Sequence, residues 1–468
     1  MLGSELSSRS RRQRRVLALR ERRAQRKNNR ALARGLAVGA VLAGAGPAAA
    51  ATFTVINTND SGPGSLRQAL IDANAAAGAD DIAFTVVPPA TISLLTALPQ
   101  ITSPLTITGL GASNLTIRRD GGGAAFRIFD IAAGAAPEVT ITGVTLTNGN
   151  SPTGGAIRAQ GPTALAVTVA DAVISGNSAG QGGGIAAVTG TSLTVRRTLI
   201  DGNTANGQGG GLYLPNVASL VLEDSTVSGN VSGDAGGGLY CNVPGGPVTI
   251  RGTTISGNTS AGGAFGGGGL SFVTYYSPPI VIENATISGN ATVSGGGGVS
   301  RAELLLPGGE GTGLSALTIT HSTITLNTAT GGFSAGGLWG AGFATTLRNT
   351  IVSGNTNAGA PDIFGSAKVN FCAVGSPLGW NPDAGSGNNL PFGTDLQLGP
   401  LQGNGGPTLT HEPGPNAPPV NAGDPAFVPP PDFDQRGPGF ARVIGGVLDI
   451  GAVERDPVPV ELQVFTIE

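Results

Sequence analysis

The sequence predicts an all-β fold: a single-stranded right-handed parallel β-helix, a three-sheet solenoid with an N-terminal capping helix and a loop-rich C-terminal cap. One observation is a repeat in which a β-branched run, one Asn and a glycine block return every 26 to 37 residues. Each repeat, as in TISGNTSAGGAFGGGGL, holds only three short strand-like pieces, too few to bury a core unless repeats stack. The composition agrees: 79 Gly, 4% aromatic and 40% hydrophobic residues suit an aliphatic core between closely stacked backbones.

Residues 1–50 have the composition of an export signal. The first 34 residues contain 12 Arg or Lys and two Glu, and the apolar run GLAVGAVLAGAGPAAAA follows. A basic stretch, an apolar stretch and small residues near Ala48–Ala50 are typical of a cleavable signal peptide. A basic tail that binds nucleic acid is the competing interpretation, and the adjacent apolar run favours export. The Arg14-Arg15 pair hints at twin-arginine export, and the choice of export route stays open.

The charge that remains after this segment limits the partners. The rest of the chain keeps 14 of the 26 basic and 27 of the 29 acidic residues, a net charge of −13. An acidic surface disfavours nucleic acid and anionic membranes as partners. No further run is long and apolar enough to span a bilayer. We therefore expect a monomer that is secreted, periplasmic or on the outer cell surface.

Residues 51–138 are expected to form the N-terminal cap and the first irregular turns. The segment SLRQALIDANAAAG, residues 65–78, predicts a helix, with Leu66, Ala69, Leu70 and Ala73 on one face. An open solenoid end exposes a hydrophobic core, so this helix is placed over that end. Short β-branched runs such as FTVIN and LTIT predict strands around it.

Residues 139–376 are expected to form the regular repeats. One Asn recurs in each, and stacked Asn side chains at a turn can hydrogen-bond to one another along the solenoid. Asn also tolerates the left-handed backbone region. The predicted ladder consists of Asn150, Asn177, Asn203, Asn230, Asn258, Asn290, Asn327 and Asn355. A metal or sugar site at these residues is the less favoured alternative.

Alternation assigns the faces of the strand before each Asn. The residue three positions before it should point inward, as in Ile174, Ile200, Val227, Ile255, Ile287 and Ile324. Its neighbours should point outward and form hydroxyl columns, chiefly Thr226, Thr254, Thr286 and Thr323, with Ser175, Ser228, Ser256, Ser288 and Thr325. Such columns could bind an ice or crystal surface, although Val173, Leu199 and Asp201 interrupt them.

Residues 377–468 lose the repeat and are expected to cap the C-terminal end. Pro, Gly, Asn and Asp dominate, in segments such as NGGPTLTHEPGP, DFDQRG and GVLDIGAVE. The charged residues of these segments predict an ion-pair cluster that holds loops over the last turn: Asp434, Arg436, Arg442, Asp449 and Glu454. A catalytic carboxylate–Arg set is the alternative.

No constellation in the sequence predicts catalysis, a metal or a cofactor. Carboxylates such as Asp80-Asp81 and Asp60 fall in the expected N-terminal cap, and Asp201 stands alone among hydroxyl residues. His321 and His411 are too few for a His-based metal site, and we expect His321 at the surface. Cys241 and Cys372 lie about five turns apart, or roughly 20 Å at strand spacing, so no disulfide is expected.

The opening FTVINTNDSGPGSLRQALIDAN, the SGN…GGG repeats and the NGGPT…NAGD…DQRG…DIGAVE region carry a family resemblance. Together they resemble bacterial choice-of-anchor Q domain proteins of the right-handed parallel β-helix, pectin-lyase-like superfamily. The repeats are also similar to those of chlamydial polymorphic outer-membrane proteins, with Ile or Val in place of Phe. The resemblance implies an exported protein with a variable C-terminal anchor, and this sequence lacks the hydrophobic C-terminal helix of such an anchor.

Two functional hypotheses remain. The favoured one is a non-enzymatic surface scaffold or adhesin that binds extracellular polysaccharide or surface proteins. The alternative is a polysaccharide lyase or glycoside hydrolase of the pectin-lyase-like fold, whose site is assembled from residues that are distant in sequence. Fold analogy alone does not decide between them.

Overall fold

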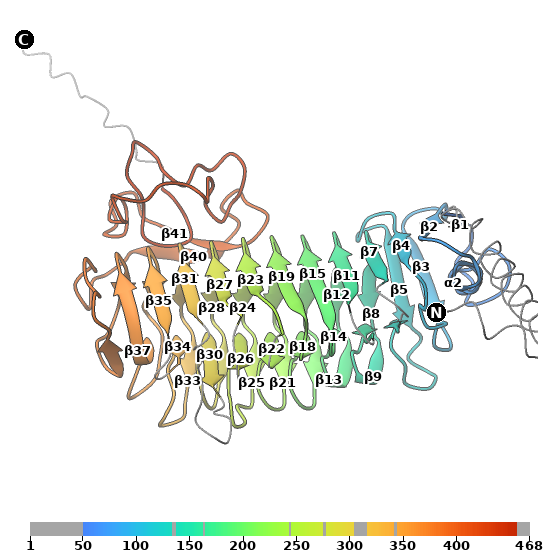
Figure 1. Cartoon of the computed structure of the whole chain (residues 1–468), viewed down its shortest axis with the longest axis horizontal. Coiled ribbons are helices and arrows are strands. Elements are labelled where there is room, and N and C mark those ends of the chain that lie inside the picture. Colours follow the sequence, from blue (N-terminus) through green and yellow to red (C-terminus); the bar gives the residue numbers. More distant parts are fainter. Residues whose placement is uncertain are drawn as a thin grey trace, which may run out of the picture. The chain divides into compact units, whose positions relative to one another are not determined.

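The computed structural model describes residues 50–132, 137–161, 164–242, 245–274, 278–303, 316–340 and 344–455. The expected export signal lies outside these residues, except for Ala50. The described chain coils into a solenoid whose strands pair in parallel with their counterparts one turn away (Figure 1). The predicted all-β parallel β-helix is therefore confirmed. In the described part, no helix has the length and hydrophobicity of a membrane crossing.

Two faces run along most of the solenoid. Face A consists of β1 (Thr52–Val55), β2 (Asp80–Phe84), β4 (Leu105–Thr108), β7 (Glu138–Thr142), β11 (Leu165–Ala170), β15 (Thr191–Arg196), β19 (Ser219–Glu223), β23 (Val248–Arg251), β27 (Ile280–Glu283), β31 (Leu317–Thr320) and β35 (Thr345–Arg348). Face B consists of β3 (Ala90–Leu94), β5 (Leu115–Arg119), β8 (Thr145–Thr147), β12 (Val173–Ser175), β16 (Leu199–Asp201), β20 (Thr226–Ser228), β24 (Thr254–Ser256), β28 (Thr286–Ser288), β32 (Thr323–Thr325), β36 (Ile351–Val352) and β38 (Ala373–Val374).

The glycine block divides the third face into a short and a longer row of strands. The short row, face D, consists of β9 (Asn150–Thr153), β13 (Ser178–Gln181), β17 (Thr204–Ala205), β21 (Val231–Ser232), β25 (Thr259–Ser260), β29 (Ala291–Thr292) and β33 (Thr328–Ala329). The longer row, face C, consists of β6 (Phe129–Ile131), β10 (Ile157–Ala159), β14 (Ile185–Ala187), β18 (Leu212–Pro215), β22 (Leu239–Asn242), β26 (Leu270–Thr274), β30 (Val299–Glu303) and β34 (Leu338–Trp339). Strand β37 (Ile363–Asn370) pairs with both β34 and β35 and so joins faces C and A, and β39 (Trp380–Pro382) pairs with β37.

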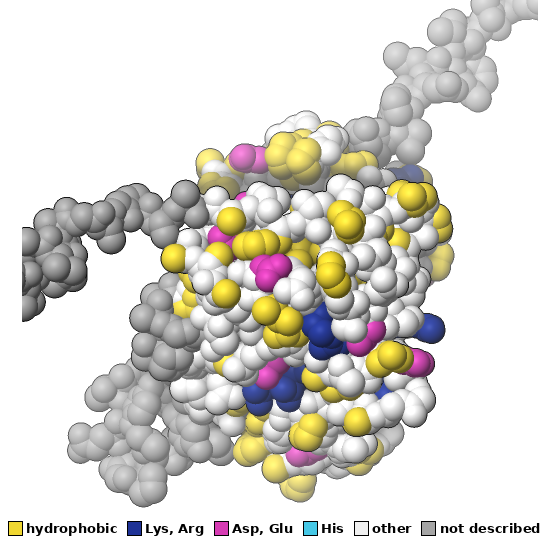
Figure 2. All heavy atoms as spheres, turned by 90° about the vertical axis from the view of Figure 1, so that its right-hand side faces the viewer, with side chains coloured by type: hydrophobic (Ala, Val, Ile, Leu, Met, Phe, Trp, Pro, Cys, Tyr) yellow, Lys and Arg dark blue, Asp and Glu magenta, His cyan; other side chains and the backbone are white. Residues whose placement is uncertain are grey.

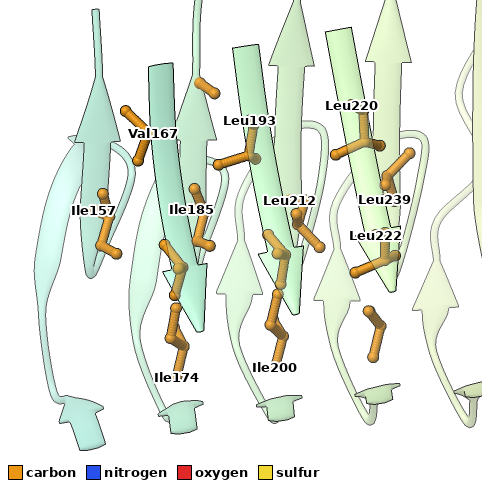
Figure 3. Packing of buried hydrophobic residues seen from close by; sticks show 14 of the residues in the cluster. Ile157, Val167, Ile174, Ile185, Leu193, Ile200, Leu212, Leu220, Leu222 and Leu239 are labelled. Atoms are coloured by element: carbon orange, nitrogen blue, oxygen red, sulfur yellow. The ribbon is translucent and has the colours of Figure 1, made fainter. Parts of the chain in front are cut away.

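The core is a set of aliphatic columns, one residue per turn. The isoleucines and the valine predicted to point inward from face B, Ile174 to Ile324, are all fully buried. In Figure 3, Ile174 and Ile200 lie below Leu193 and Leu220 in the same interior. Because the paired strands keep one register from turn to turn, as in Ile174 opposite Ile200, each side chain packs on its own counterpart. The inward assignment is confirmed.

The predicted N-terminal helix is confirmed as α2 (Leu66–Ala75). Ser65 caps it, since its Oγ accepts a hydrogen bond from the backbone N–H of Gln68 (3.2 Å). The buried side chains are those expected, Leu66, Ala69, Leu70 and Ala73. The helix packs on β1 and β2 at the N-terminal end of the solenoid, and Figure 2 shows side chains of both charges among hydrophobic ones at this end.

Seven of the eight predicted Asn residues form one buried ladder. From Asn177 to Asn327, the side-chain Oδ1 of the next Asn accepts both the backbone N–H and the Nδ2–H of the Asn before it, at 2.9–3.1 Å. Asn355 ends the ladder on the Oδ1 of Asp362, 2.9 Å from its Nδ2. The residue before the Asn has the positive φ, as at Gly257 (φ 63°). The left-handed conformation that the sequence analysis considered for the Asn itself is therefore not adopted.

Asn150 was wrongly placed in the ladder. Strand β9 pairs with β13 so that Asn150 lies opposite Ser178, which leaves Gly149 opposite Asn177. The backbone N–H of Gly149 donates to Asn177 Oδ1 (2.9 Å), while Asn150 is exposed. A side chain at residue 149 is excluded because its Cβ would lie 2.0 Å from the carbonyl oxygen of Gly155.

The C-terminal part has two separate positions on the solenoid. Residues 389–393 cover the last turn, where the backbone N–H of Leu390 donates to Cys372 O (2.9 Å). The C-terminal segment, defined here as residues 403–455, instead lies along the outside of face B (Figure 1). It includes β41 (Thr410–Pro413), which pairs in antiparallel fashion with β40 (Leu398–Gln402). The expectation that the ion-pair cluster sits over the last turn is therefore wrong.

The two cysteines are buried and free. Cys241 lies on β22 and Cys372 lies just before β38. Burial raises the pKa of each thiol to about 12, so both are thiols at neutral pH.

Candidate functional site

The C-terminal segment covers part of the hydroxyl columns on face B. Gln435 is central to this contact: its Nε2 donates to Thr254 Oγ1 (3.0 Å), and its Oε1 accepts from Thr286 Oγ1 (2.6 Å). Further along, the backbone N–H of Ala452 donates to Thr323 Oγ1 (3.1 Å). These hydroxyls point away from the core as predicted, but they are buried. The flat exposed hydroxyl surface that ice binding would need is therefore absent from β24 to β32.

A column of left-handed residues forms the corner between faces A and B. The residue after each of the strands β11, β15, β19, β23, β27, β31, β35 and β37 takes a φ of 45–60°, in the order Asp171, Arg197, Asp224, Gly252, Asn284, His321, Asn349 and Phe371. The following residue often carries a buried hydroxyl, such as Thr198 or Ser225, which donates to the carbonyl oxygen two residues earlier. The same carbonyl oxygens also accept a backbone N–H from the adjacent turn, as Arg196 O does from Asp171, so each hydroxyl supplies a second donor.

A groove, called here the corner groove, lies between this column and the C-terminal segment. It has a volume of about 540 Å³. The lining residues are Asp224, Arg251, Gly252, Glu283 and Asn284 from the solenoid, with residues 430–435, Gly437 and Pro438 from the C-terminal segment. A second hollow of about 360 Å³ shares Asp224 and extends toward Asp171, Arg197 and Pro407.

Charged side chains alternate along the solenoid wall of the groove. Arg251 Nε lies 3.0 Å from a carboxylate oxygen of Glu283, and Arg197 makes a 2.7 Å pair with Asp171. Asp224 has no hydrogen bond or ion pair to its carboxylate in the described part of the chain. Burial raises the pKa of Asp224, and the neighbouring charge of Glu223 adds to the shift.

The five residues of the predicted C-terminal cluster do lie together. Arg436 Nη2 lies 2.7 Å from Asp434 Oδ2, and Asp434 also accepts the backbone N–H of Glu454 (2.7 Å). Arg442 Nη2 lies 3.3 Å from Glu454 Oε2, which accepts the backbone N–H of Asp449 (3.0 Å). Burial raises the pKa of Glu454, against the opposing effect of the Arg442 charge. All five are buried, and their contacts tie together the loops of the C-terminal segment.

Both histidines are buried where the C-terminal segment meets the solenoid, so the surface position expected for His321 is wrong. The His321 ring packs against Phe427, with ring centroids 4.7 Å apart. Burial, with the charges of Arg442 and Arg348, lowers the pKa of His321 to about 3. His411 Nε2 lies 2.8 Å from Ser288 Oγ, and its Nδ1 lies 2.7 Å from the carbonyl oxygen of Gly399.

The N-terminal carboxylates have structural partners. Asp60 pairs with Arg67 of α2 (2.7 Å), and Asp80 accepts the backbone N–H of Ala51 (2.9 Å). On face B, Asp201 accepts the hydroxyl of Ser228 (2.6 Å). Among the described residues, no three His, Cys, Asp or Glu side chains are arranged to hold a metal ion.

Sequence reasoning missed the corner column and the groove beside it. The repeat alignment contained a signal for the column, because Asp, Arg, Gly, Asn or His stands three residues before each inward Ile or Val, from Asp171 to His321. The groove has no such signal, because its second wall is more than 140 residues away in the chain, as in the contact of Asn284 with Phe433.

The comparison with protein-family models agrees with this architecture. The family model for the right-handed beta helix region matches residues 109–302 and 198–371. Among solved structures, the crystal structure of pectate lyase Pel9A is 15% identical, with 88% of this chain and 98% of that chain covered and a TM-score of 0.45. No curated protein sequence matches the chain. The family matches span more than half of the chain, which therefore belongs to the right-handed β-helix family.

Proposed function

We propose that this chain is an exported β-helix protein, secreted or on the cell surface, that binds glycans or partner proteins without transforming them. The corner groove is its binding surface. The observation that supports this proposal is the groove itself, which is open and combines charged and amide side chains with the partly exposed ring of Phe433. Polar groups that hydrogen-bond and an apolar surface for stacking are the elements of a small binding site.

The contacts of three acidic residues, Asp434, Glu454 and Glu283, support binding over catalysis at these positions. In the C-terminal cluster, Asp434 and Glu454 contact arginines and backbone N–H groups inside the segment. Glu283, on the wall of the groove, is paired with Arg251. A general acid or base must instead reach a proton of the substrate.

A glycan array probed with the purified chain tests the binding function. Binding to one glycan class, with no release of reducing ends or unsaturated products from pectin and alginate, is the expected result. Product release would overturn the non-enzymatic part of the proposal, and the absence of binding to any glycan or surface protein would overturn all of it. Fractionation of cells that produce the full chain tests export, since retention in the cytoplasm would contradict it.

A further inference from the structure

The corner groove exists because one position of the corner column lacks a side chain. From Asp171 to Phe371 this column carries a side chain in every turn except at Gly252. The backbone does not require glycine there, because Asp224 and Asn284 take a similar φ of 48° in the adjacent turns. A Cβ at residue 252 would lie 2.3 Å from Asp224 Oδ1. The missing side chain thus leaves the space into which the Asp224 carboxylate projects.

The opposite wall is held rigidly. Asn284 Nδ2 donates to the carbonyl oxygen of Phe433 (2.8 Å), and Gln435, two residues on, is anchored to Thr254 and Thr286. Although Asp434 and Gln435 are buried, Asp432 is exposed and Phe433 keeps 41% of its surface exposed. A carboxylate and an aromatic ring are therefore presented to the groove by a fixed backbone.

Two of the carboxylates in the groove have no paired cation within the described ranges, although the charges of Arg197, Arg251 and Arg196 act on Asp224. Glu283 is paired with Arg251, and Asp434 is paired with Arg436. Asp224 and Asp432 form no ion pair among the residues that the structure describes. Asp224 is also partly buried, where its charge is poorly solvated. A positively charged ligand group would stabilise both carboxylates, and the face of Phe433 adds a cation–π partner.

We propose that the corner groove binds an oligosaccharide that carries free amino groups, with an ammonium group between Asp224 and Asp432 and a sugar ring against Phe433. This inference rests on the binding function proposed above and names its ligand class. The second hollow, which shares Asp224, gives room for further sugar units along the corner. Turns stack at about 4.8 Å, close to the length of one sugar unit in an extended chain, so neighbouring units meet equivalent positions in neighbouring turns.

The charge of the groove selects against acidic sugars. A uronate would bring a further carboxylate next to Asp224 and Asp432. The nearby arginines already pair with carboxylates of the solenoid, Arg251 with Glu283 and Arg197 with Asp171, so they would offset its desolvation only in part. A neutral acetylated sugar would keep the stacking and lose the charge-assisted hydrogen bonds.

Calorimetric titration with three matched hexasaccharides tests the ligand class: β-1,4-linked glucosamine, its N-acetylated form and galacturonate. The glucosamine hexamer is expected to bind at least about 10-fold more tightly than the acetylated one, which corresponds to one charge-assisted hydrogen bond. Equal affinity for the two, or tighter binding of the galacturonate hexamer, overturns the proposal. A lysine hexapeptide that competes equally well shows a general cation site and overturns the assignment to a glycan.

Variants test the location. Asp224→Asn and Asp432→Asn should each weaken binding of the glucosamine hexamer by about 10-fold, while Asp81→Asn, the same change on an exposed residue of β2, should not. Asp432 is exposed, so its variant remains informative even if Asp224→Asn unfolds. If the hexamer binds and neither variant weakens it, the groove is excluded as the binding surface, while glycan binding by the chain still stands. If the array finds glycan ligands but none with amino groups, only this inference fails.

Discussion

The Asn ladder allows a sharp test, the comparison of Asn258→Ala with Asn150→Ala. Asn258 Oδ1 accepts both the backbone N–H and the Nδ2–H of Asn230, at 3.0 and 2.9 Å. Its Nδ2 donates to Val227 O and to Asn290 Oδ1, both at 2.9 Å. Alanine removes all four hydrogen bonds and, because the site is fully buried, no bulk water replaces them.

The expected cost follows from the groups left without a partner. The N–H and one Nδ2–H of Asn230 lose their acceptor, and Val227 O loses a donor; Asn290 Oδ1 keeps the N–H of residue 258 (3.0 Å). Three buried polar groups at about 1–2 kcal/mol each give a destabilisation of about 3–6 kcal/mol. Asn150 is exposed and outside the ladder, so its replacement should change stability by less than about 0.5 kcal/mol.

Urea unfolding of the wild type and the two variants, followed by circular dichroism, measures the difference. Native-state hydrogen exchange at the Asn230 amide adds a local readout, because this N–H should lose protection in Asn258→Ala. The reasoning is refuted if Asn258→Ala costs less than about 1 kcal/mol, or if Asn150→Ala costs as much as Asn258→Ala.

Three further outcomes are expected. His321 has a pKa of about 3 in the folded chain, against its ordinary value of 6.5. As the pH falls, the unfolded chain therefore binds a proton at this residue before the folded chain does. The stability that the neutral ring provides is complete above about pH 6.5 and is lost as the pH falls toward 3. At pH 4 this loss is about 3 kcal/mol. The variant His321→Asn should therefore show a flatter curve of stability against pH, and Asn is suited to the backbone there because Asn349 takes the same φ. An unchanged curve would contradict the assignment of the pH dependence to His321. Leu326 is 58% exposed and takes a φ of 59°, at the position where the other turns of the Asn ladder have Gly. Leu326→Gly should therefore raise the free energy of unfolding by about 0.5–1 kcal/mol. A loss of stability would show that the backbone there is not strained. Gln435→Leu should remove the hydrogen bonds that hold the C-terminal segment on Thr254 and Thr286. Limited proteolysis should then cut within residues 403–455 faster than in the wild type. Gln402→Leu, at an exposed residue of β40, is the control.

Much of the solenoid was predictable because each turn repeats one local pattern. The inward Ile255, the outward Thr254 and the ladder position of Asn258 all follow from strand alternation and the glycine turn. The same pattern misled at Asn150, where the chain uses Gly149 at the ladder position and the Asn comes one residue late. The signal was present: the residue three before Asn150 is Thr147, while the buried Leu146 is three before Gly149.

The sequence by itself determined the parallel β-helix, its core columns, its Asn ladder and its capping helix, because these depend on contacts between equivalent residues one repeat apart. It also identified Asp434, Arg436, Arg442, Asp449 and Glu454 as a possible cluster. Only the tertiary structure decided that this cluster lies along face B, that Thr254 and Thr286 are buried beneath Gln435, and that a groove opens beside Gly252. These features depend on contacts between residues 149 to 181 positions apart in the sequence, which no repeat pattern encodes.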